Sequence, residues 1–261
     1  MRKIVASVLF AALLLTLVSC SGKTNPIVIG GNSEVKENVY VVTGENGKQS
    51  FEYEITEKNT IAITGYTGSF DKHQVVIPDR IDSIEVTEIG PKAFYYDNSI
   101  TTVTIPETVT KIGAWAFAGC TYLENINIPE TVTEIGAGAF YKCTSLSSIE
   151  LPGSLGEISN YTFYGCDLLE TINIPEGVTA IGDSAFWGCN ALVSVTGMEG
   201  VKSIGAYAFN DCSKLADISI SAATEEIGEN AFNGCEALVI KVVAGSFAET
   251  YVMSYGYNYT K

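Results

Sequence analysis

The stretch LENINIPETVTEIGAGAFYKC, residues 123–143, holds one complete unit of a repeat that runs through most of the chain. Phenylalanines recur every 23 residues, at Phe94, Phe117, Phe140, Phe163, Phe186, Phe209 and Phe232. Six cysteines follow in the same phase, at Cys120, Cys143, Cys166, Cys189, Cys212 and Cys235. A fixed period between about 20 and 29 residues predicts a solenoid, because a single repeat cannot bury its apolar face without stacked neighbours.

The pattern within one unit indicates how the chain runs around a coil. L-x-x-I-x-I alternates as a half-buried strand does, which sends Ile126 and Ile128 inward. Pro129 ends the strand, and V-x-x-I-G then crosses back, with glycine permitting a tight turn. We expect Ala-Phe-x-x-Cys to be a short helical turn. The predicted fold class is therefore an α/β solenoid of about seven coils, of the leucine-rich-repeat type.

The ends of the solenoid depart from the repeat, as terminal coils must. The expected solenoid covers residues 71–244, and its first coil has extra residues between Pro78 and Val86. Alternating apolar and polar residues in 38–70 predict a small β cap before that coil. Residues 245–261 are expected to form a C-terminal cap with a helical piece, whose tyrosines cover the last apolar edge.

The first twenty residues have the pattern of a targeting segment. Two basic residues precede an apolar run, residues 4–18, which is short for a bilayer span and suits a secretory signal. The run ends in LVSC, positions 17–20, which resembles a bacterial lipobox. We expect residues 1–19 to be a lipoprotein signal peptide, Cys20 to be lipidated and 20–37 to be a flexible spacer. An ordinary signal peptide with a chance cysteine is the alternative.

Composition excludes several classes of function. The net charge is −15 and the chain has two arginines, whereas nucleic-acid binding needs a basic surface that replaces phosphate counterions. His73 is the only histidine, so Ser-His-Asp, Cys-His and histidine-rich metal sites lack their residues. We expect no catalytic residues, no metal and no cofactor, and therefore a binding protein. A hydrolase with a site between the N-terminal cap and the first coil is the enzyme alternative.

The I-P, I-G and A-F-x-x-C signatures of the repeat resemble those of the BspA-type leucine-rich-repeat family of bacterial surface proteins. YEI at 53–55 and IAITGY at 61–66 resemble the usual lead-in of that family. The resemblance implies a cell-surface protein that binds other proteins in adhesion, co-aggregation or host contact, and it brings no catalytic residues. We thus expect a non-enzymatic lipoprotein on the outer-membrane surface, which contacts the membrane only through its lipid.

Outward positions of the predicted strands form one candidate binding surface. Side by side, they would present a flat sheet of hydroxyls and amides, the kind of surface that solenoids use for partners. The alternative is a solvated face that keeps the rod soluble. The candidate partner-binding residues, which we call the strand face, are Thr102, Thr104, Asn125, Asn127, Ser148, Glu150, Thr171, Asn173, Ser194 and Thr196, with Asp217 and Ser219 in the same phase.

Aromatic residues beside the repeated phenylalanines form a second candidate. Tyr141, Tyr164 and Trp187 occupy three successive coils and could hold sugar rings or anchor a protein interface. Tyr95 shares their phase, while Trp115, Tyr161 and Tyr207 sit just before the Ala-Phe pairs. The alternative is that these rings only shield the outer turns. A glycan-binding surface lipoprotein is accordingly the second hypothesis, and a periplasmic envelope-assembly scaffold is the third.

The six phased cysteines allow two interpretations. Export makes disulfides possible. Cysteine is also among the most buried residue types, and a 23-residue phase marks a packing position. We expect a ladder of free, buried thiols.

Overall fold

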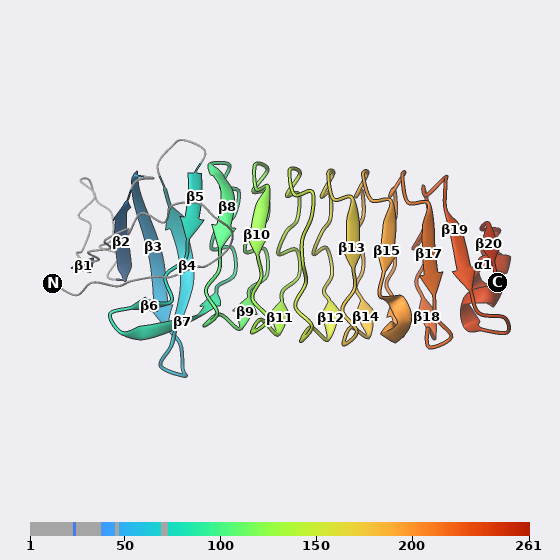
Figure 1. Cartoon of the computed structure of the whole chain (residues 1–261), viewed down its shortest axis with the longest axis horizontal. Coiled ribbons are helices and arrows are strands. Elements are labelled where there is room, and N and C mark those ends of the chain that lie inside the picture. Colours follow the sequence, from blue (N-terminus) through green and yellow to red (C-terminus); the bar gives the residue numbers. More distant parts are fainter. Residues whose placement is uncertain (1–22, 25–37, 45–46, 69–72) are drawn as a thin grey trace, which may run out of the picture.

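A β-solenoid of about eight turns forms most of the computed structural model, which describes residues 23–24, 38–44, 47–68 and 73–261. The turns stack into an elongated rod (Figure 1), with β2 (Val39–Gly44) and β3 (Gly47–Ile55) near one end and α1 (Phe247–Tyr255) at the other. The coil length of about 23 residues agrees with the sequence, with about one turn more than the seven expected. Cys20 and the predicted signal peptide lie outside the described residues.

Helix content is small, so the fold is a β-solenoid rather than the expected α/β solenoid. In the described ranges, helix is limited to α1 and the 3-10 helix η1 (Met198–Gly200). The Ala-Phe-x-x-Cys segments are turns instead. The N–H of Ala116 donates to the Gly113 carbonyl within its own coil, whereas the N–H of Phe117 donates to Ala139 of the next coil at 2.8 Å. A helix would consume the backbone groups that here link successive coils.

Short parallel strands form two further sides of each coil. One side holds β5 (His73–Val76), β8 (Ile100–Thr104) and β10 (Asn125–Asn127), and then β13 (Thr171–Asn173), β15 (Ser194–Thr196), β17 (Asp217–Ile220), β19 (Val239–Val242) and β20 (Tyr259–Thr260). The V-x-x-I-G side holds β7 (Ile84–Ile89), β9 (Lys111–Ile112) and β11 (Glu134–Ile135), and then β12 (Glu157–Ile158), β14 (Ala180–Ile181), β16 (Ser203–Ile204) and β18 (Glu226–Ile227).

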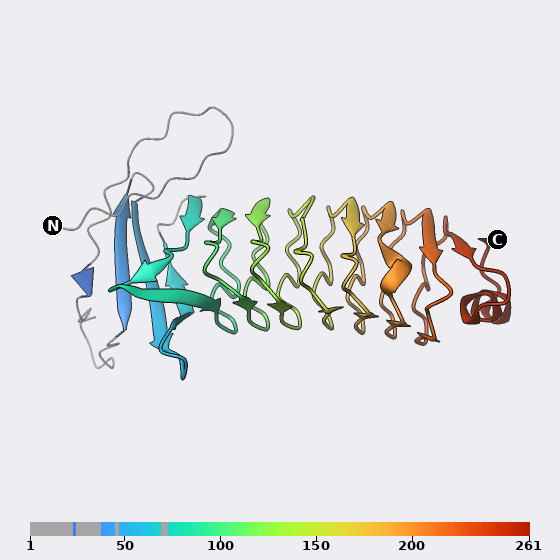
Figure 2. The ribbon, with the colours of Figure 1, turned by 60° about the horizontal axis from the view of Figure 1, so that its bottom comes forward.

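The N-terminal strands continue the sheet of the first coil. β2, β3 and β4 (Ile61–Thr67) pair antiparallel, and β4 runs parallel to β7. The two-residue strand β1 (Lys23–Thr24) pairs with β2, and β6 (Arg80–Ile81) pairs with β7. Figure 2 shows β2 and β3 as long strands beside the short strands of the coils. The sheet edge of the first coil is therefore hydrogen-bonded to this antiparallel unit.

A column of stacked phenylalanines runs along the centre of the rod. Successive rings from Phe94 to Phe232 have centroids 4.9–5.7 Å apart and planes within 14° of parallel. Tyr66 continues the column at the N-terminal end, 5.0 Å from Phe94, and Tyr251 meets Phe232 at 6.5 Å at the other end. The repeat spacing of phenylalanine thus places one fully buried ring in each coil.

The six repeat cysteines are free and buried, as expected. Each thiol lies 3.0–3.2 Å from the carbonyl of a phenylalanine in the preceding coil, as Cys143 Sγ does from Phe117 O. Burial raises the pKa of the Cys143 thiol well above its ordinary value. These cysteines are packing residues that also hydrogen-bond neighbouring coils.

One irregularity interrupts the stack next to Ser159. Glycines of the I-G dipeptides lie against the preceding coil, so that a Cβ on Gly136 would stand 2.5 Å from the Ala114 nitrogen. Ser159 replaces that glycine in the coil of Phe163. Its Cβ cannot occupy this space, and its hydroxyl donates to the Ile135 carbonyl at 2.9 Å. In the described part of the chain, the sheets accordingly end at β11 and β10 and restart at β12 and β13.

The Ala-Phe side of the coils stays continuous across this irregularity. The N–H of Phe140 donates to Thr162 at 2.9 Å, and that of Lys142 donates to Tyr164 at 2.6 Å. The coils therefore separate on their two strand sides while the turns that carry phenylalanine and cysteine remain bonded.

Candidate functional site

The strand face is less uniform than its sequence suggests. β10 pairs with β8 so that Asn125 lies beside Thr102, but Ser148 and Glu150 lie outside any strand. Eight of the ten predicted residues therefore fall on two separate sheets, and the other two lie in the irregular coil between these sheets. Asn125, Asn127, Ser148, Glu150, Thr171, Asn173 and Thr196 are exposed, whereas Thr102, Thr104 and Ser194 are partly buried.

Two of the strand-face amides bond to neighbouring coils. Asn127 accepts the N–H of Ile105 at 2.8 Å and donates to the Ile105 carbonyl at 3.1 Å. Asn173 accepts a hydrogen bond from the Thr196 hydroxyl at 2.9 Å. These side chains stabilise the stacking of coils, so part of the expected polar surface is already engaged.

Aromatic side chains gather on the turn side of the rod. They line a shallow depression of about 610 Å³, which we call the aromatic groove, formed by Tyr95, Tyr96, Trp115, Tyr141, Tyr161, Tyr164, Ser184, Trp187 and Tyr207. The predicted strip of Tyr141, Tyr164 and Trp187 is part of it. The groove spans six successive coils, which makes it longer than the three-coil strip that the sequence predicted.

Ring contacts hold the groove in a fixed shape. Trp115 and Tyr161 have planes 24° apart with centroids at 6.3 Å, although they lie two coils apart. Tyr141 and Tyr164 stack on one another at 4.8 Å. Tyr141 meets Trp115 at 62°, and Tyr164 meets Tyr161 at 53°. The groove therefore has two ring orientations, with Trp115 and Tyr161 in one and Tyr141 and Tyr164 in the other.

Left-handed backbone carries several of these rings. Trp115, Tyr161 and Tyr207 have φ of 60°, 60° and 57°. The same position is taken by Gly138 and Ser184 in the coils between them. A left-handed conformation costs a residue with a side chain about 1–2 kcal/mol, and for a bulky residue it marks strain that is typical of functional positions. The alternation of large and small residues leaves each large ring room over the next coil.

Tyr96 belongs to the groove and was not identified from the sequence. It occupies the phase in which other coils have Gly119, Gly165 and Gly188, and it shares their left-handed backbone with φ of 57°. A Cβ on Gly119 would stand 2.7 Å from the Tyr96 ring, which shows that this ring covers the next coil. The sequence did contain an indication of this residue, because Tyr96 stands at a repeat position where several other coils have glycine.

Lysine and aspartate side chains contact several rings of the aromatic groove. Lys142 Nζ is 5.4 Å from the centre of the Tyr141 ring, and Lys92 Nζ is 5.5 Å from that of Tyr95. Trp187 donates its indole N–H to the Asp211 carboxylate at 3.0 Å. The groove thus combines aromatic surface with phenol hydroxyls, the Asp211 carboxylate and the ammonium groups of Lys92 and Lys142.

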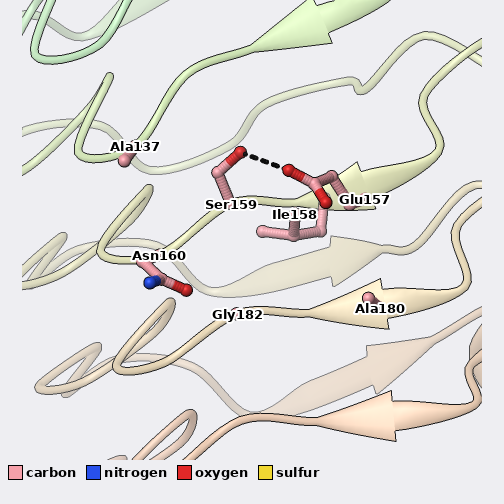
Figure 3. A pocket seen from close by; sticks show the side chains of 7 residues that line it. All are labelled: Ala137, Glu157, Ile158, Ser159, Asn160, Ala180 and Gly182. Carbon is pink, nitrogen blue, oxygen red and sulfur yellow. Dashed lines mark hydrogen bonds between the residues drawn. The ribbon is translucent and has the colours of Figure 1, made fainter.

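A second depression, of about 260 Å³, lies where the coils separate at Ser159 (Figure 3). Its polar side chains are already paired. The Ser159 hydroxyl is 3.1 Å from Glu157 Oε1, and Asn160 Oδ1 accepts the N–H of Asp183 at 2.8 Å. The depression lies beside the missing glycine, and Glu157, Ser159 and Asn160 are the polar side chains of its lining.

No cluster of three or more histidine, cysteine or acidic side chains in the described residues could hold a metal ion. None of the helices in the same ranges has the length and apolar character needed to cross a membrane.

Comparison with known proteins identifies the repeat. The model of the BspA type leucine-rich-repeat region matches residues 87–214 and 156–251, and six copies are found. The chain belongs to the BspA-type leucine-rich-repeat family. Members of this family are generally protein-interaction or adhesion scaffolds without catalytic function. No curated protein matches this BspA-type chain in sequence.

Two solved structures resemble this BspA-type solenoid. A leucine rich cell surface protein of Faecalibacterium prausnitzii is 35% identical with a TM-score of 0.68, over 77% of this chain and 54% of that one. A leucine-rich-repeat protein of T. pallidum is 34% identical with a TM-score of 0.68, over 80% of this chain and 95% of that one. This chain therefore spans about half of the Faecalibacterium protein.

Proposed function

We propose that this protein is an exported, lipid-anchored adhesion protein that binds macromolecules on other cells through the aromatic groove. The observation that carries the proposal is the row of half-exposed aromatic rings across six coils. Tyrosine and tryptophan are enriched among the residues that dominate binding energy at interfaces. Membership of a family of interaction and adhesion scaffolds supports the same function.

Export and anchoring rest on the N-terminal sequence. The LVSC pattern ending at Cys20 resembles a lipobox, and a lipid with two or more acyl chains gives stable attachment. The similar Faecalibacterium protein is described as a cell surface protein, which supports a surface location for this chain.

The groove is a stronger candidate than the strand face for a physical reason. Three of its rings, Trp115, Tyr161 and Tyr207, stand on left-handed backbone that bulky residues disfavour. Packing alone does not require a large ring there, because Ser184 and Asn230 take the same position in other coils. The strand face offers small polar groups, and some of them already bond to neighbouring coils. Small polar side chains contribute little to binding energy compared with buried aromatic anchors.

Adhesion of cells tests this function. A bacterium expressing the full chain is incubated with cultured epithelial cells and with neighbouring bacteria, and adherent cells are counted. The groove variant combines Trp115→Asn and Tyr161→Asn. Asparagine tolerates left-handed backbone, and Asn230 already occupies this position of the repeat in another coil. The matched strand-face variant combines Asn125→Lys and Thr171→Lys, which replace two exposed residues.

We expect the unmodified chain to increase adhesion, the groove variant to abolish that increase and the strand-face variant to retain it. The reverse pattern would move the binding surface to the strand face. No increase with either target cell would contradict the adhesion function. Protease treatment of intact cells, with Cys20→Ala as control, tests the surface location. Protection of the repeat domain until the envelope is broken would instead support a periplasmic scaffold.

A further inference from the structure

Trp115 covers Gly138 of the next coil with one face of its ring. A Cβ on Gly138 would stand 2.6, 2.7 and 2.8 Å from three successive atoms of the six-membered ring of Trp115. Similar distances to neighbouring ring atoms mean that Gly138 lies under the face of the ring, not at its edge. Trp115 is only partly buried, so part of its ring surface is available to a ligand.

Tyr161 is the next large ring at this position of the repeat, two coils further along the rod. Its plane is 24° from that of Trp115, and 39% of the residue is exposed. Tyr141 and Tyr164 stand at a steep angle to these two rings and stack on each other. The four rings thus form two pairs, Trp115 with Tyr161 and Tyr141 with Tyr164, which stand at a steep angle to one another.

The composition of the groove favours an amphipathic ligand. Eight of its nine lining residues are aromatic and the ninth is Ser184, so the lining has no aliphatic side chain. Phenol hydroxyls can donate or accept hydrogen bonds around the rings, and the Asp211 carboxylate can accept them. A ligand that matches this surface has flat apolar faces and hydroxyl groups at its edges, which is the chemistry of a pyranose sugar.

Shape and charge restrict the ligand further. The groove is shallow and follows the rod over six coils, whereas pockets for small molecules enclose most of the ligand surface. A linear polymer can contact successive rings along such a groove. The net charge of −15 repels polyanions, and the ammonium groups of Lys92 and Lys142 at the rings are accompanied by the Asp211 carboxylate at Trp187.

We infer that the aromatic groove binds a neutral, linear glycan that lies along the rod and stacks its sugar rings on Trp115 and Tyr161. This inference rests on the proposed function, because it names the chemistry of the partner that the same groove binds. The stacked pair of Tyr141 and Tyr164 flanks the sugar chain and supplies hydroxyls.

Glycan binding is measured with the purified full chain on an array of neutral and anionic linear glycans. The unmodified chain is compared with Trp115→Asn/Tyr161→Asn and with Tyr122→Ala, which removes an exposed tyrosine outside the groove. We expect binding to neutral linear glycans, a loss on the order of tenfold or more in the groove variant, and no change in the control. Circular dichroism verifies that both variants are folded.

Binding to no neutral glycan, or binding that the groove variant retains, would overturn the inference. Treatment of target cells separates this failure from failure of the proposed function. Periodate oxidises sugar diols, so we expect it to remove groove-dependent adhesion. If that adhesion survives periodate and disappears after protease treatment of the target cells, the groove binds a protein. The proposed function would then stand while the glycan inference would fall.

Discussion

The six-membered ring of Trp115 lies face-on over Gly138 in the next coil, where a Cβ would stand 2.6 Å from the ring. The two residues occupy the same position of successive repeats and have φ of 60° and 63°. A large ring in one coil therefore depends on a small residue in the next. This dependence explains why large and small residues alternate through Trp115, Gly138, Tyr161, Ser184 and Tyr207.

Replacement of Gly138 by alanine tests the contact. We expect Gly138→Ala to displace the Trp115 ring, to shift tryptophan fluorescence and to reduce adhesion although every aromatic residue is kept. Gly188→Ala is the matched control, because φ there is 71° and the nearest heavy atom to a Cβ is 3.9 Å away. Both substitutions carry the strain of left-handed backbone, and Gly138→Ala should be less stable than the control by about 1–2 kcal/mol in chemical denaturation. Equal stability and unchanged fluorescence would contradict the contact.

A serine in place of glycine should open the stack wherever it is introduced. We expect Gly136→Ser to lower the free energy of unfolding by about 1–3 kcal/mol, since its Cβ would collide with the backbone at Ala114. The control is Ser159→Gly, which removes the side chain at the existing irregularity and should leave stability within about 1 kcal/mol of the unmodified chain. A fully stable Gly136→Ser variant would show that the missing glycine does not explain the separation at Ser159.

Stability should fall at alkaline pH because of the cysteine ladder. Burial raises the pKa of Cys143 above the ordinary value of 9.0, so the folded state keeps a proton that the unfolded state releases. The effect is absent below pH 9 and grows above it, by about 1.36 kcal/mol per pH unit for each such thiol. Cys143→Ala should reduce the slope of unfolding free energy against pH between 9 and 10.5. If Cys143→Ala leaves this slope unchanged, titration of Cys143 is not a cause of the alkaline instability.

Accessibility of the thiols can be followed by mass spectrometry. In the native protein we expect little alkylation of the six repeat cysteines, because they are buried and their thiolates are disfavoured. Under denaturing, non-reducing conditions all six should be modified. Six cysteines that resist alkylation after denaturation would indicate disulfides and contradict the free-thiol ladder.

Much of the fold could be predicted because the repeat has a constant length of 23 residues. The phase of Phe140 and Cys143 specified buried positions, and the structure places a ring and a thiol there in each coil. The turn state of Ala-Phe-x-x-Cys could not be predicted in the same way. A short apolar segment suits a helix or a turn equally, and the bonds that decide between them come from the next coil, as from Phe117 to Ala139.

The candidate site was predicted in part. Tyr141, Tyr164 and Trp187 could be recognised from their common phase, whereas the contact of Trp115 with Tyr161 depends on a ring that crosses over Gly138. The interruption of the strand face at Ser148 depends on how whole coils stack. Sequence periodicity describes positions within one coil, and these features arise between coils.

Tryptophan fluorescence during ligand binding tests the central claim most directly. The chain has two tryptophans, Trp115 and Trp187, and both line the aromatic groove. Glycopeptides released by protease from target cells are titrated into the full chain, and emission is compared with binding measured by calorimetry. If the groove is the binding surface, emission changes with the same saturation curve as the heat of binding. Saturable heat with unchanged emission would place the ligand on another face and contradict the account.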